Sequence, residues 1–220
     1  MIAGELEVDR DRCVDFSLYL ISDRKAVPQN RDLLTTIEQA LEGGTDAVQL
    51  RDKDLPADQR LALARQLRVL TRRHRARLII NGAVDIALAV EADGVHLGAS
   101  SLPIAEARRL LGPQKLIGYS AHGPEELLTA HEQGADFATF SPIFFTPCKA
   151  DFGPPLGLQR LAAACRISPL PVLALGGIDI NRVSAVRRAG AHGIALISAI
   201  LGAENPREAA RDLSLALGLR

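Results

Sequence analysis

Gly44-Thr45-Asp46-Ala47-Val48 is the first of four similar stretches in this chain of 220 residues, and the fold class follows from their spacing. The other three are Glu91-Ala92-Asp93-Gly94-Val95, Gly134-Ala135-Asp136-Phe137 and Gly190-Ala191-His192-Gly193-Ile194. Each stretch stands where a helix would end and the chain would enter an even-numbered strand. One copy for every two strand–helix units is the spacing that a β/α barrel requires.

Short apolar runs rich in strand-forming residues alternate with helix-period segments from Leu18 onward, which is typical of parallel βα units. The predicted strands are Leu18–Ser22, Ala47–Leu50, Leu78–Ile80, Gly94–Leu97, Leu116–Tyr119, Phe137–Phe140, Val172–Leu175 and Ile194–Ile197. The predicted helices are Asp32–Glu42, Pro56–Arg73, Val84–Val90, Ile104–Leu111, Pro124–Gln133, Leu158–Cys165, Asn181–Ala189 and Pro206–Leu217. Eight such units predict a single (β/α)8 TIM-barrel domain over residues 1–220, with residues 1–16 as an N-terminal extension.

Composition excludes several classes of function. The chain has 26 basic and 26 acidic side chains, and its aromatics are 2 Tyr and 6 Phe with no Trp, so nucleic acid is not an expected partner. No apolar run reaches the roughly 20 residues of a membrane span, and the chain begins without the apolar run of a secretion signal. The three cysteines show neither pairing nor metal-ligand spacing. We therefore expect a cytoplasmic protein without membrane contact, disulfides or structural zinc.

Two loops predict a phosphate site. In a β/α barrel the active site lies at the carboxyl ends of the strands. Gly176 and Gly177 follow the seventh strand, and Ile197 and Ser198 open a short helix after the eighth. Glycines let the backbone approach an anion, and the N–H groups at a helix start point toward it. The alternative is a plain turn and helix cap.

Gln49, Arg51 and Lys53 alternate through the second strand and beyond its end, so their side chains share one face. Two cations and an amide on one face predict a second anion subsite. The alternative is a salt-bridge network that closes the end of the barrel.

Further polar residues follow the third and fifth strands. Asn81 ends the third strand, and Ser120 and His122 follow the fifth, two positions apart. His122 is the expected acid or base because histidine titrates near neutral pH. His96, on the fourth strand, is expected to be a hydrogen-bonded core residue.

The longest connection, Ser141–Pro155, has the length of a lid or binding loop. It contains Thr146, Cys148 and Lys149, a hydroxyl, a thiol and an ammonium that could close over a bound anion. The alternative is an inert cysteine beside a surface lysine.

With these motifs in one order, the chain resembles the thiamine phosphate synthase and thiazole tautomerase (TenI-like) superfamily of β/α barrels. The resemblance covers nearly the whole chain. Its stretches are Leu18-Tyr19-Leu20-Ile21-Ser22-Asp23, Val48-Gln49-Leu50-Arg51-Asp52-Lys53, Asn81-Gly82-Ala83-Val84-Asp85-Ile86-Ala87-Leu88, Ala92-Asp93-Gly94-Val95-His96-Leu97-Gly98, Gly118-Tyr119-Ser120-Ala121-His122, Pro171-Val172-Leu173-Ala174-Leu175-Gly176-Gly177-Ile178 and Ile197-Ser198-Ala199-Ile200.

The resemblance implies one of two activities. The synthase joins hydroxymethylpyrimidine diphosphate to a thiazole phosphate and uses Mg²⁺ on the diphosphate, whereas the tautomerase moves a proton within a carboxythiazole phosphate without a metal. The synthase pattern implies diphosphate contacts at Gln49, Arg51 and Lys53, pocket residues at Asn81 and Ser120, loop contacts at Thr146 and Lys149, and a thiazole phosphate site at Gly177, Ile197 and Ser198.

The synthase's two metal-binding aspartates do not carry over, because Gly82 and Ser101 stand in their places. Mg²⁺ prefers carboxylate oxygens, so their loss favours the tautomerase branch. Asp85, a turn further along, could substitute only with a different reach. One feature favours the synthase instead. The face formed by Gln49, Arg51 and Lys53 is more typical of the synthase than of the tautomerase.

We therefore predict a thiazole tautomerase-like isomerase that makes the thiazole ring aromatic. His122 would take and return the proton, Gln49, Arg51 and Lys53 would hold the substrate carboxylate, and the loops at Gly177 and Ser198 would hold the phosphate. No cofactor is expected. The alternatives are a thiamine phosphate synthase, which would need Mg²⁺, and a non-catalytic binder of thiamine phosphate. The expected partner is a small phosphorylated thiazole, and relatives of this superfamily suggest a homodimer.

Overall fold

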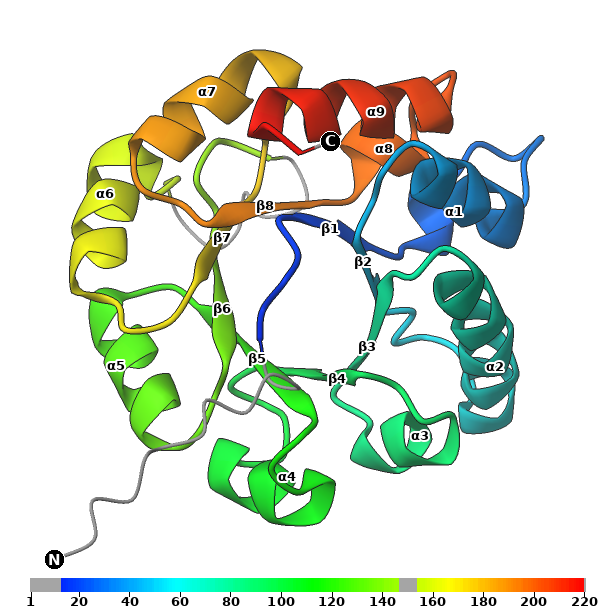
Figure 1. Ribbon diagram of the computed structural model, residues 1–220, viewed down its shortest axis with the longest axis horizontal. Helices are drawn as coiled ribbons and strands as arrows, with labels where there is room; N and C mark the ends of the chain where they lie inside the picture. The colour runs from blue at the N-terminus through cyan, green and yellow to red at the C-terminus, as the bar shows by residue number, and fades with distance from the viewer. Residues whose placement is uncertain (1–12, 147–153, 220) are drawn as a thin grey trace, which may run out of the picture.

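The computed structural model describes residues 13–146 and 154–219, which form a closed barrel of parallel strands in the order β1 to β8 (Figure 1). The strands are β1 (Leu18–Ile21), β2 (Ala47–Leu50), β3 (Arg77–Asn81), β4 (Gly94–Leu97), β5 (Leu116–Ala121), β6 (Phe137–Phe140), β7 (Val172–Leu175) and β8 (Gly193–Leu196). The predicted (β/α)8 barrel is confirmed, and each predicted strand end lies within about two residues of the observed one, an ordinary difference between assignments.

Helices surround the barrel (Figure 1). They are α1 (Leu33–Glu42), α2 (Ala57–Arg73), α3 (Val84–Ala89), α4 (Ile104–Leu111), α5 (Pro124–Glu132), α6 (Gly157–Ile167), α7 (Ile180–Arg188), α8 (Ser198–Leu201) and α9 (Pro206–Leu217). The short helix expected after the eighth strand is α8, and a 3₁₀ turn that was not predicted, η2 (Arg24–Ala26), follows β1. No helix in the described ranges is long and apolar enough to cross a membrane.

The four-copy repeat has a structural cause at the amino ends of the even strands. In the first three copies the aspartate carboxylate accepts a hydrogen bond from the backbone N–H of the first or second residue of the preceding odd strand. These bonds are Leu18 to Asp46 at 2.9 Å, Leu78 to Asp93 at 2.7 Å and Ile117 to Asp136 at 2.7 Å. In each pair the aspartate N–H also donates to the carbonyl of the same partner. The aspartate thus aligns each pair of strands at its start.

The three aspartates differ in their charge partners. Arg68 and Arg108 form ion pairs with Asp93 and Asp136, whereas Asp46 has no ion pair among the described residues. Burial raises the pKa of Asp46 to about 6, although the backbone N–H groups of Ser17, Leu18 and Asp46 oppose the shift. The charge of Asp46 therefore depends on pH in the mildly acidic range.

The barrel interior is closed at its amino end by aromatic side chains. Phe16 and Tyr19 pack against Phe137, with ring centroids 5.2 and 5.8 Å from that of Phe137. Phe16 is buried, so the end of the expected N-terminal extension belongs to the core; residues 1–12 lie outside the described part. His192, in the fourth repeat copy, donates from Nε2 to the Phe16 carbonyl and fixes this segment.

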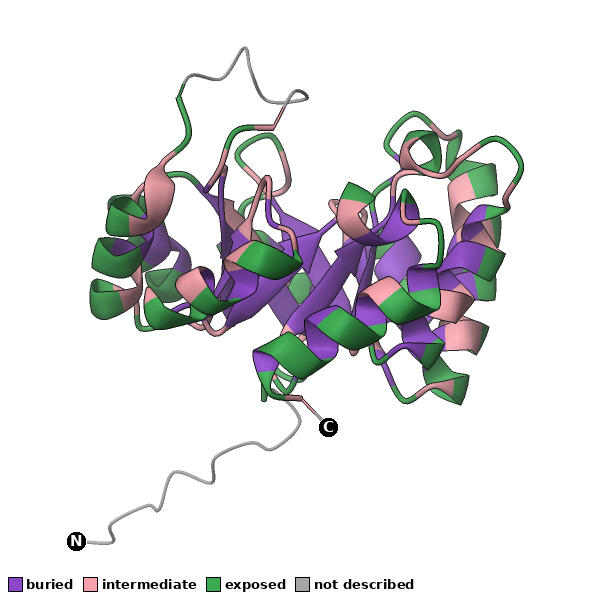
Figure 2. Cartoon of the chain, turned by 90° about the horizontal axis from the view of Figure 1, so that it is seen from above, coloured by how far each residue is buried: buried purple, intermediate pink, exposed green. Residues whose placement is uncertain are grey.

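A second apolar layer lies between the barrel and the helices. Strands β1, β2, β4, β6 and β8 are buried along their whole length, as parallel strands covered on both faces require. Figure 2 shows the buried strands at the centre and helices whose exposed residues face outward. Packing on both faces fixes the strand ends, and these ends carry the candidate site.

Candidate active site

The carboxyl ends of the strands form one end of the barrel, which we call the mouth. The interior cluster contains Ala47, Ile79 and Leu116. Because side chains alternate along a strand, residues an even number of positions further along face the same side. Arg51, Asn81 and Ser120 occupy such positions at the mouth. The sequence prediction that these strand ends contribute to one place is consistent with this register.

Asp52 lies between the two candidate cations but faces the opposite way. Arg51 and Lys53 are exposed, whereas the Asp52 side chain is 2% exposed and forms an ion pair with Arg24 at 3.1 Å. The Ser22 hydroxyl donates to Asp52 and accepts from the backbone N–H of Arg51 at 2.9 Å. Asp52 thereby fixes the backbone that carries Arg51 and Lys53.

Asp52 was not among the site residues predicted from the sequence. The signal was present in the alternation itself, because a residue between two cations that share one face must lie on the opposite face. A buried carboxylate needs charged or hydrogen-bonding partners, and Ser22 with Arg24 in the preceding loop supplies them.

Gln49 is inside the barrel. It is 1% exposed, and its Nε2 donates to the Tyr19 hydroxyl at 2.8 Å. Gln49 shares a face with Arg51, as predicted, but it lies two residues deeper than Arg51. Its contact with Tyr19 supports the floor below the mouth.

His96 is a buried, hydrogen-bonded residue, as expected from the sequence. Its Nε2 lies 3.0 Å from Ser120 Oγ and 3.4 Å from Thr139 Oγ1. Burial, and to a smaller extent the charge of Arg51, lowers the pKa of His96 to about 3, so the ring is neutral at physiological pH. Arg51 lies two residues beyond the interior residue Gln49 and on the same face, which places it at the mouth above this interior. Partial burial, together with Arg51, also lowers the pKa of Lys53.

Gly82 and Ser101 face each other although 19 positions separate them in the sequence. A Cβ atom placed on Gly82 would lie 3.7 Å from Ser101 Oγ, with nothing else within 4 Å. Ser101 Oγ accepts a hydrogen bond from the Gly98 N–H at 3.0 Å. The two positions that lack the expected carboxylates are therefore neighbours in space, beside Asn81 at the end of β3.

His122 follows β5 and is exposed. Its Nδ1 donates to the carbonyl of Ser141 at 2.7 Å, and its backbone N–H donates to Glu126 at 3.0 Å. A carbonyl can only accept, so this contact places the proton of the neutral ring on Nδ1 and leaves Nε2 as the basic nitrogen. The structure thus ties His122 to the loop after β6.

The glycines after β7 have a structural role besides letting a ligand approach the backbone. A Cβ on Gly176 would lie 2.9 Å from Pro142 Cα, and one on Gly177 would lie 2.6 Å from the Phe145 carbonyl. The N–H groups of Ile143 and Phe144 donate to the carbonyls of Leu175 and Gly176. The loop after β6 therefore packs directly on the two glycines.

α8 begins at Ser198 after Ile197, and no described side chain caps it. Its first N–H groups therefore have no side-chain acceptor in the described part of the chain, as the phosphate prediction requires. Thr146 is half-buried at the end of the described part of its loop, whereas Cys148 and Lys149 lie outside the described residues.

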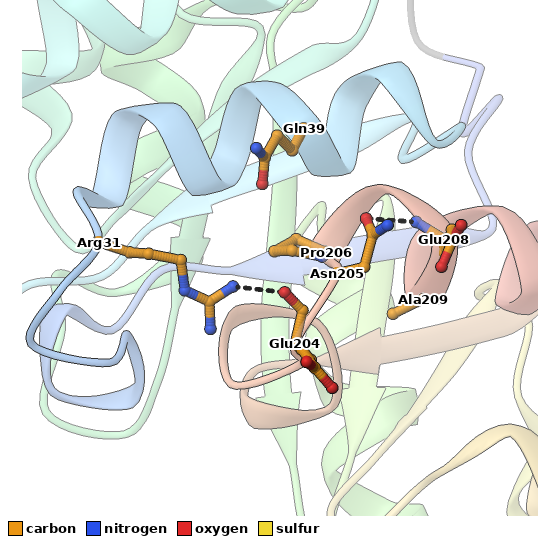
Figure 3. A pocket seen from close by; sticks show the side chains of 7 residues that line it. All are labelled: Arg31, Gln39, Glu204, Asn205, Pro206, Glu208 and Ala209. Carbon is orange, nitrogen blue, oxygen red and sulfur yellow. Dashed lines mark hydrogen bonds between the residues drawn. The ribbon is translucent and has the colours of Figure 1, made fainter.

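One surface pocket lies away from these residues, between α1 and α9 (Figure 3). Arg31 donates there to the Glu204 carbonyl, and Asn205 caps α9. The pocket contains none of the predicted site residues. Within residues 13–146 and 154–219, no cluster of three or more His, Cys, Asp or Glu side chains could hold a metal ion.

The barrel and its mouth define a class: β/α-barrel proteins with basic and hydroxyl side chains at the carboxyl ends of the strands. A family model described as thiamine monophosphate synthase matches residues 18–200. The chain belongs to this thiamine phosphate synthase and TenI-like family.

Relatives support the same assignment. A protein of Geobacter sulfurreducens named putative thiamine-phosphate synthase is 54% identical over 91% of this chain and 93% of its own length. The thiamine-phosphate synthase of Roseiflexus sp. is 44% identical over 89% of this chain and 83% of its own. The thiamine phosphate pyrophosphorylase structure from Pyrococcus furiosus superposes with a TM-score of 0.84 at 36% identity, covering 92% of this chain and 96% of that one.

The prediction of an isomerase closer to the tautomerase branch is wrong. Relatives with 42–54% identity along most of the chain are named thiamine-phosphate synthase. The prediction depended on two positions, Gly82 and Ser101, whereas the Gln49, Arg51 and Lys53 face already pointed to the synthase. Two substitutions at one place do not outweigh similarity along the whole barrel.

Proposed function

We propose that this chain is a thiamine-phosphate synthase, a transferase that joins hydroxymethylpyrimidine diphosphate to thiazole phosphate. The observation that carries the proposal is the 54% identity, over 91% of the chain, to a relative named putative thiamine-phosphate synthase. The structural similarity to a thiamine phosphate pyrophosphorylase supports the same reaction class.

The reaction breaks the bond between the pyrimidine methylene carbon and a diphosphate oxygen, and pyrophosphate leaves with the electron pair. The thiazole nitrogen supplies its lone pair to the methylene carbon, which gives a thiazolium cation. No proton is released in this bond exchange. The synthase reaction therefore does not need the proton transfer that was expected of His122. We propose His122 only as a residue that contacts the bound substrates.

The mouth offers matching groups for two anionic substrates. Arg51 and Lys53 would stabilise the developing negative charge of the diphosphate, because a charge-assisted hydrogen bond strengthens as that charge grows. Asn81 and Ser120 would orient the pyrimidine substrate. The loops at Gly176, Gly177, Ile197 and Ser198 would hold the thiazole phosphate. Thr146, with Cys148 and Lys149 outside the described residues, would contribute from the loop after β6.

The family's reaction implies Mg²⁺, and the donor set of this chain does not fit it at the expected place. Mg²⁺ takes carboxylate oxygens in near-octahedral geometry. Gly82 offers no side chain, and the Ser101 hydroxyl accepts the Gly98 N–H. Asp85 is exposed in the first turn of α3, beyond this position. No catalytic step is therefore assigned here to a metal held by the protein.

The proposal is tested by incubating the purified chain with both substrates and measuring pyrophosphate together with thiamine phosphate by mass spectrometry. Equal amounts of both products are expected. Arg51→Gln should reduce kcat/KM at least about tenfold, because it removes a charge from the leaving group. Arg65→Gln makes the same charge change at an exposed position of α2 and should leave the rate unchanged. Absence of thiamine phosphate under all conditions would refute the proposed function.

A further inference from the structure

We infer that the mouth binds the diphosphate group directly through side-chain donors, without a metal ion held by the protein. The inference rests on the proposed function, because it concerns the binding mode of the same substrate. It differs from the family expectation at two neighbouring positions, Gly82 and Ser101.

The first observation is the space between these two residues. Nothing but Ser101 Oγ lies within 4 Å of a Cβ built on Gly82, at 3.7 Å. Two carboxylates at these positions would face each other across this space and could share a cation. This chain has hydrogen atoms on one side and a hydroxyl on the other.

The second observation is the direction of the Ser101 hydroxyl bond. Ser101 Oγ accepts the Gly98 N–H, so its own proton is available to an acceptor. An anion can accept a hydrogen bond from that O–H, whereas a single uncharged hydroxyl is a much weaker ligand for Mg²⁺ than a carboxylate. The hydroxyl is thus arranged as a donor.

The third observation connects this position to the cations. A Cβ on Gly98 would lie 3.9 Å from the Ser120 side chain, and Ser120 contacts His96 at 3.0 Å. His96 pairs with Asn81 on β3, and Leu50 on β2 pairs with Ile80, so Arg51 follows its strand beside Asn81. Ser101, Ser120 and Arg51 therefore border one continuous region of the mouth, with Lys53 two positions beyond Arg51.

Three carboxylates near the cations have partners of their own, and Asp85 is exposed in the first turn of α3, beyond the space between Gly82 and Ser101. Asp52 is buried and forms an ion pair with Arg24, and Asp54 pairs with Arg24 and Lys25. Glu126 accepts the backbone N–H of His122. This part of the described mouth therefore has two cations, Arg51 and Lys53, and two hydroxyls, and no carboxylate opposes them. Such a set of groups is complementary to a multiply charged anion.

The binding mode is tested with inorganic pyrophosphate and Mn²⁺ as separate probes. Isothermal titration should detect pyrophosphate binding in EDTA, and Mg²⁺, which complexes pyrophosphate in solution, should not strengthen it. Electron paramagnetic resonance should detect no Mn²⁺ bound to the protein alone. Pyrophosphate binding that requires Mg²⁺, no pyrophosphate binding in either buffer, or Mn²⁺ bound at this position in the wild type would each overturn the inference.

A double variant restores the missing carboxylates. Gly82→Asp with Ser101→Asp should gain Mn²⁺ binding and bind pyrophosphate in EDTA at least about tenfold more weakly, because two negative charges replace neutral groups. Aspartate tolerates the positive φ of +70° at position 82 better than most residues. The matched control, Gly82→Asn with Ser101→Asn, has nearly the same shape without charge and should gain no Mn²⁺ binding.

The two proposals can fail separately. Pyrophosphate binding in EDTA without thiamine phosphate formation would refute the synthase and leave the direct binding mode intact. Thiamine phosphate formation with Mg²⁺-dependent pyrophosphate binding would refute the direct mode and leave the synthase intact. The double Asp variant could also gain no Mn²⁺ binding while its thermal unfolding matches that of the double Asn control. Carboxylates at positions 82 and 101 would then not create a cation site, and the inference would be overturned.

Discussion

The imidazole Nε2 of His96 lies 3.0 Å from the hydroxyl oxygen of Ser120, while its Nδ1 is buried without a hydrogen-bond partner in the described structure. A buried N–H without an acceptor is rarer in proteins than an acceptor without a donor. The proton of the neutral ring therefore belongs on Nε2. Ser120 Oγ therefore accepts a hydrogen bond from the Nε2–H of His96, and its own O–H is available to a ligand at the mouth.

This relationship predicts the tautomer of His96. Heteronuclear NMR of the imidazole nitrogens should show His96 neutral and protonated at Nε2 from about pH 5 to 8, because burial holds its pKa at about 3. His122 should show the opposite tautomer, since its Nδ1 donates to Ser141. A His96 ring that is protonated at Nδ1, or that titrates near pH 6.5, would contradict the assignment.

Asp52 provides a second prediction, about positioning. Asp52→Asn should cost about 2 kcal/mol of stability, because it weakens buried charge-assisted bonds to Ser22 and Arg24. We also expect the KM for the pyrimidine diphosphate to rise several-fold with a smaller change in kcat, since Arg51 would remain but lose its fixed backbone. Urea unfolding and steady-state kinetics measure the two effects.

The control for this change is Asp54→Asn. Asp54 is two residues further along and pairs with Arg24 and Lys25 at the surface, where solvent screens the charges. This variant should have wild-type stability and KM. Equal effects of the two substitutions would show that Asp52 acts only through surface charge.

Asp46 predicts a specific pH dependence of stability. Its pKa is about 6 in the folded chain and near 3.8 when unfolded, so the folded state holds the proton more tightly between these values. Its contribution is present below about pH 4 and is lost as pH rises through 6, by about 3 kcal/mol. His96 acts in the opposite direction, because its lowered pKa stabilises the folded state as pH rises toward 6.5.

The two contributions oppose each other in the wild type. Asp46→Asn should therefore make stability rise more steeply between about pH 4 and 6.5, since the opposing contribution of Asp46 is removed. Urea unfolding at several pH values measures this slope. Asp93→Asn is not expected to do the same, because Arg68 pairs with that carboxylate. An unchanged slope in Asp46→Asn would refute the raised pKa.

The sequence was sufficient for the barrel because the repeat marks strand pairs. Asp46, Asp93 and Asp136 recur where even strands start, and each bonds the preceding strand. The mouth was only partly predictable. Arg51 and Lys53 followed from alternation, but the burial of Asp52 depends on Arg24 and Ser22, 28 and 30 positions away. Contacts between loops of different strands leave no local pattern.

The sequence pattern did not distinguish the synthase from the tautomerase for a related reason. Gly82 and Ser101 show that two carboxylates are missing, but they do not show which other groups bind the diphosphate. The region between Ser101 and Arg51 is formed by Gly98 after β4, Ser120 on β5, His96 on β4 and Asn81 on β3. Only the folded chain brings these groups together.

Gly177 gives a final prediction, about the loop that follows β6. At this position φ is +63°, and a Cβ would lie 2.6 Å from the Phe145 carbonyl and 2.9 Å from Phe144 Cβ. Gly177→Ala should therefore cost about 1–3 kcal/mol and displace the loop, which would weaken phosphate binding at least several-fold. Gly218→Ala shares a positive φ of +81° but has nothing within 4 Å, so it isolates the backbone cost and should leave phosphate binding unchanged. Phosphate titrations and thermal unfolding of both variants separate the backbone cost from the displacement of the loop. Equal phosphate affinity in Gly177→Ala and the wild type would show that this loop contact does not shape the phosphate site.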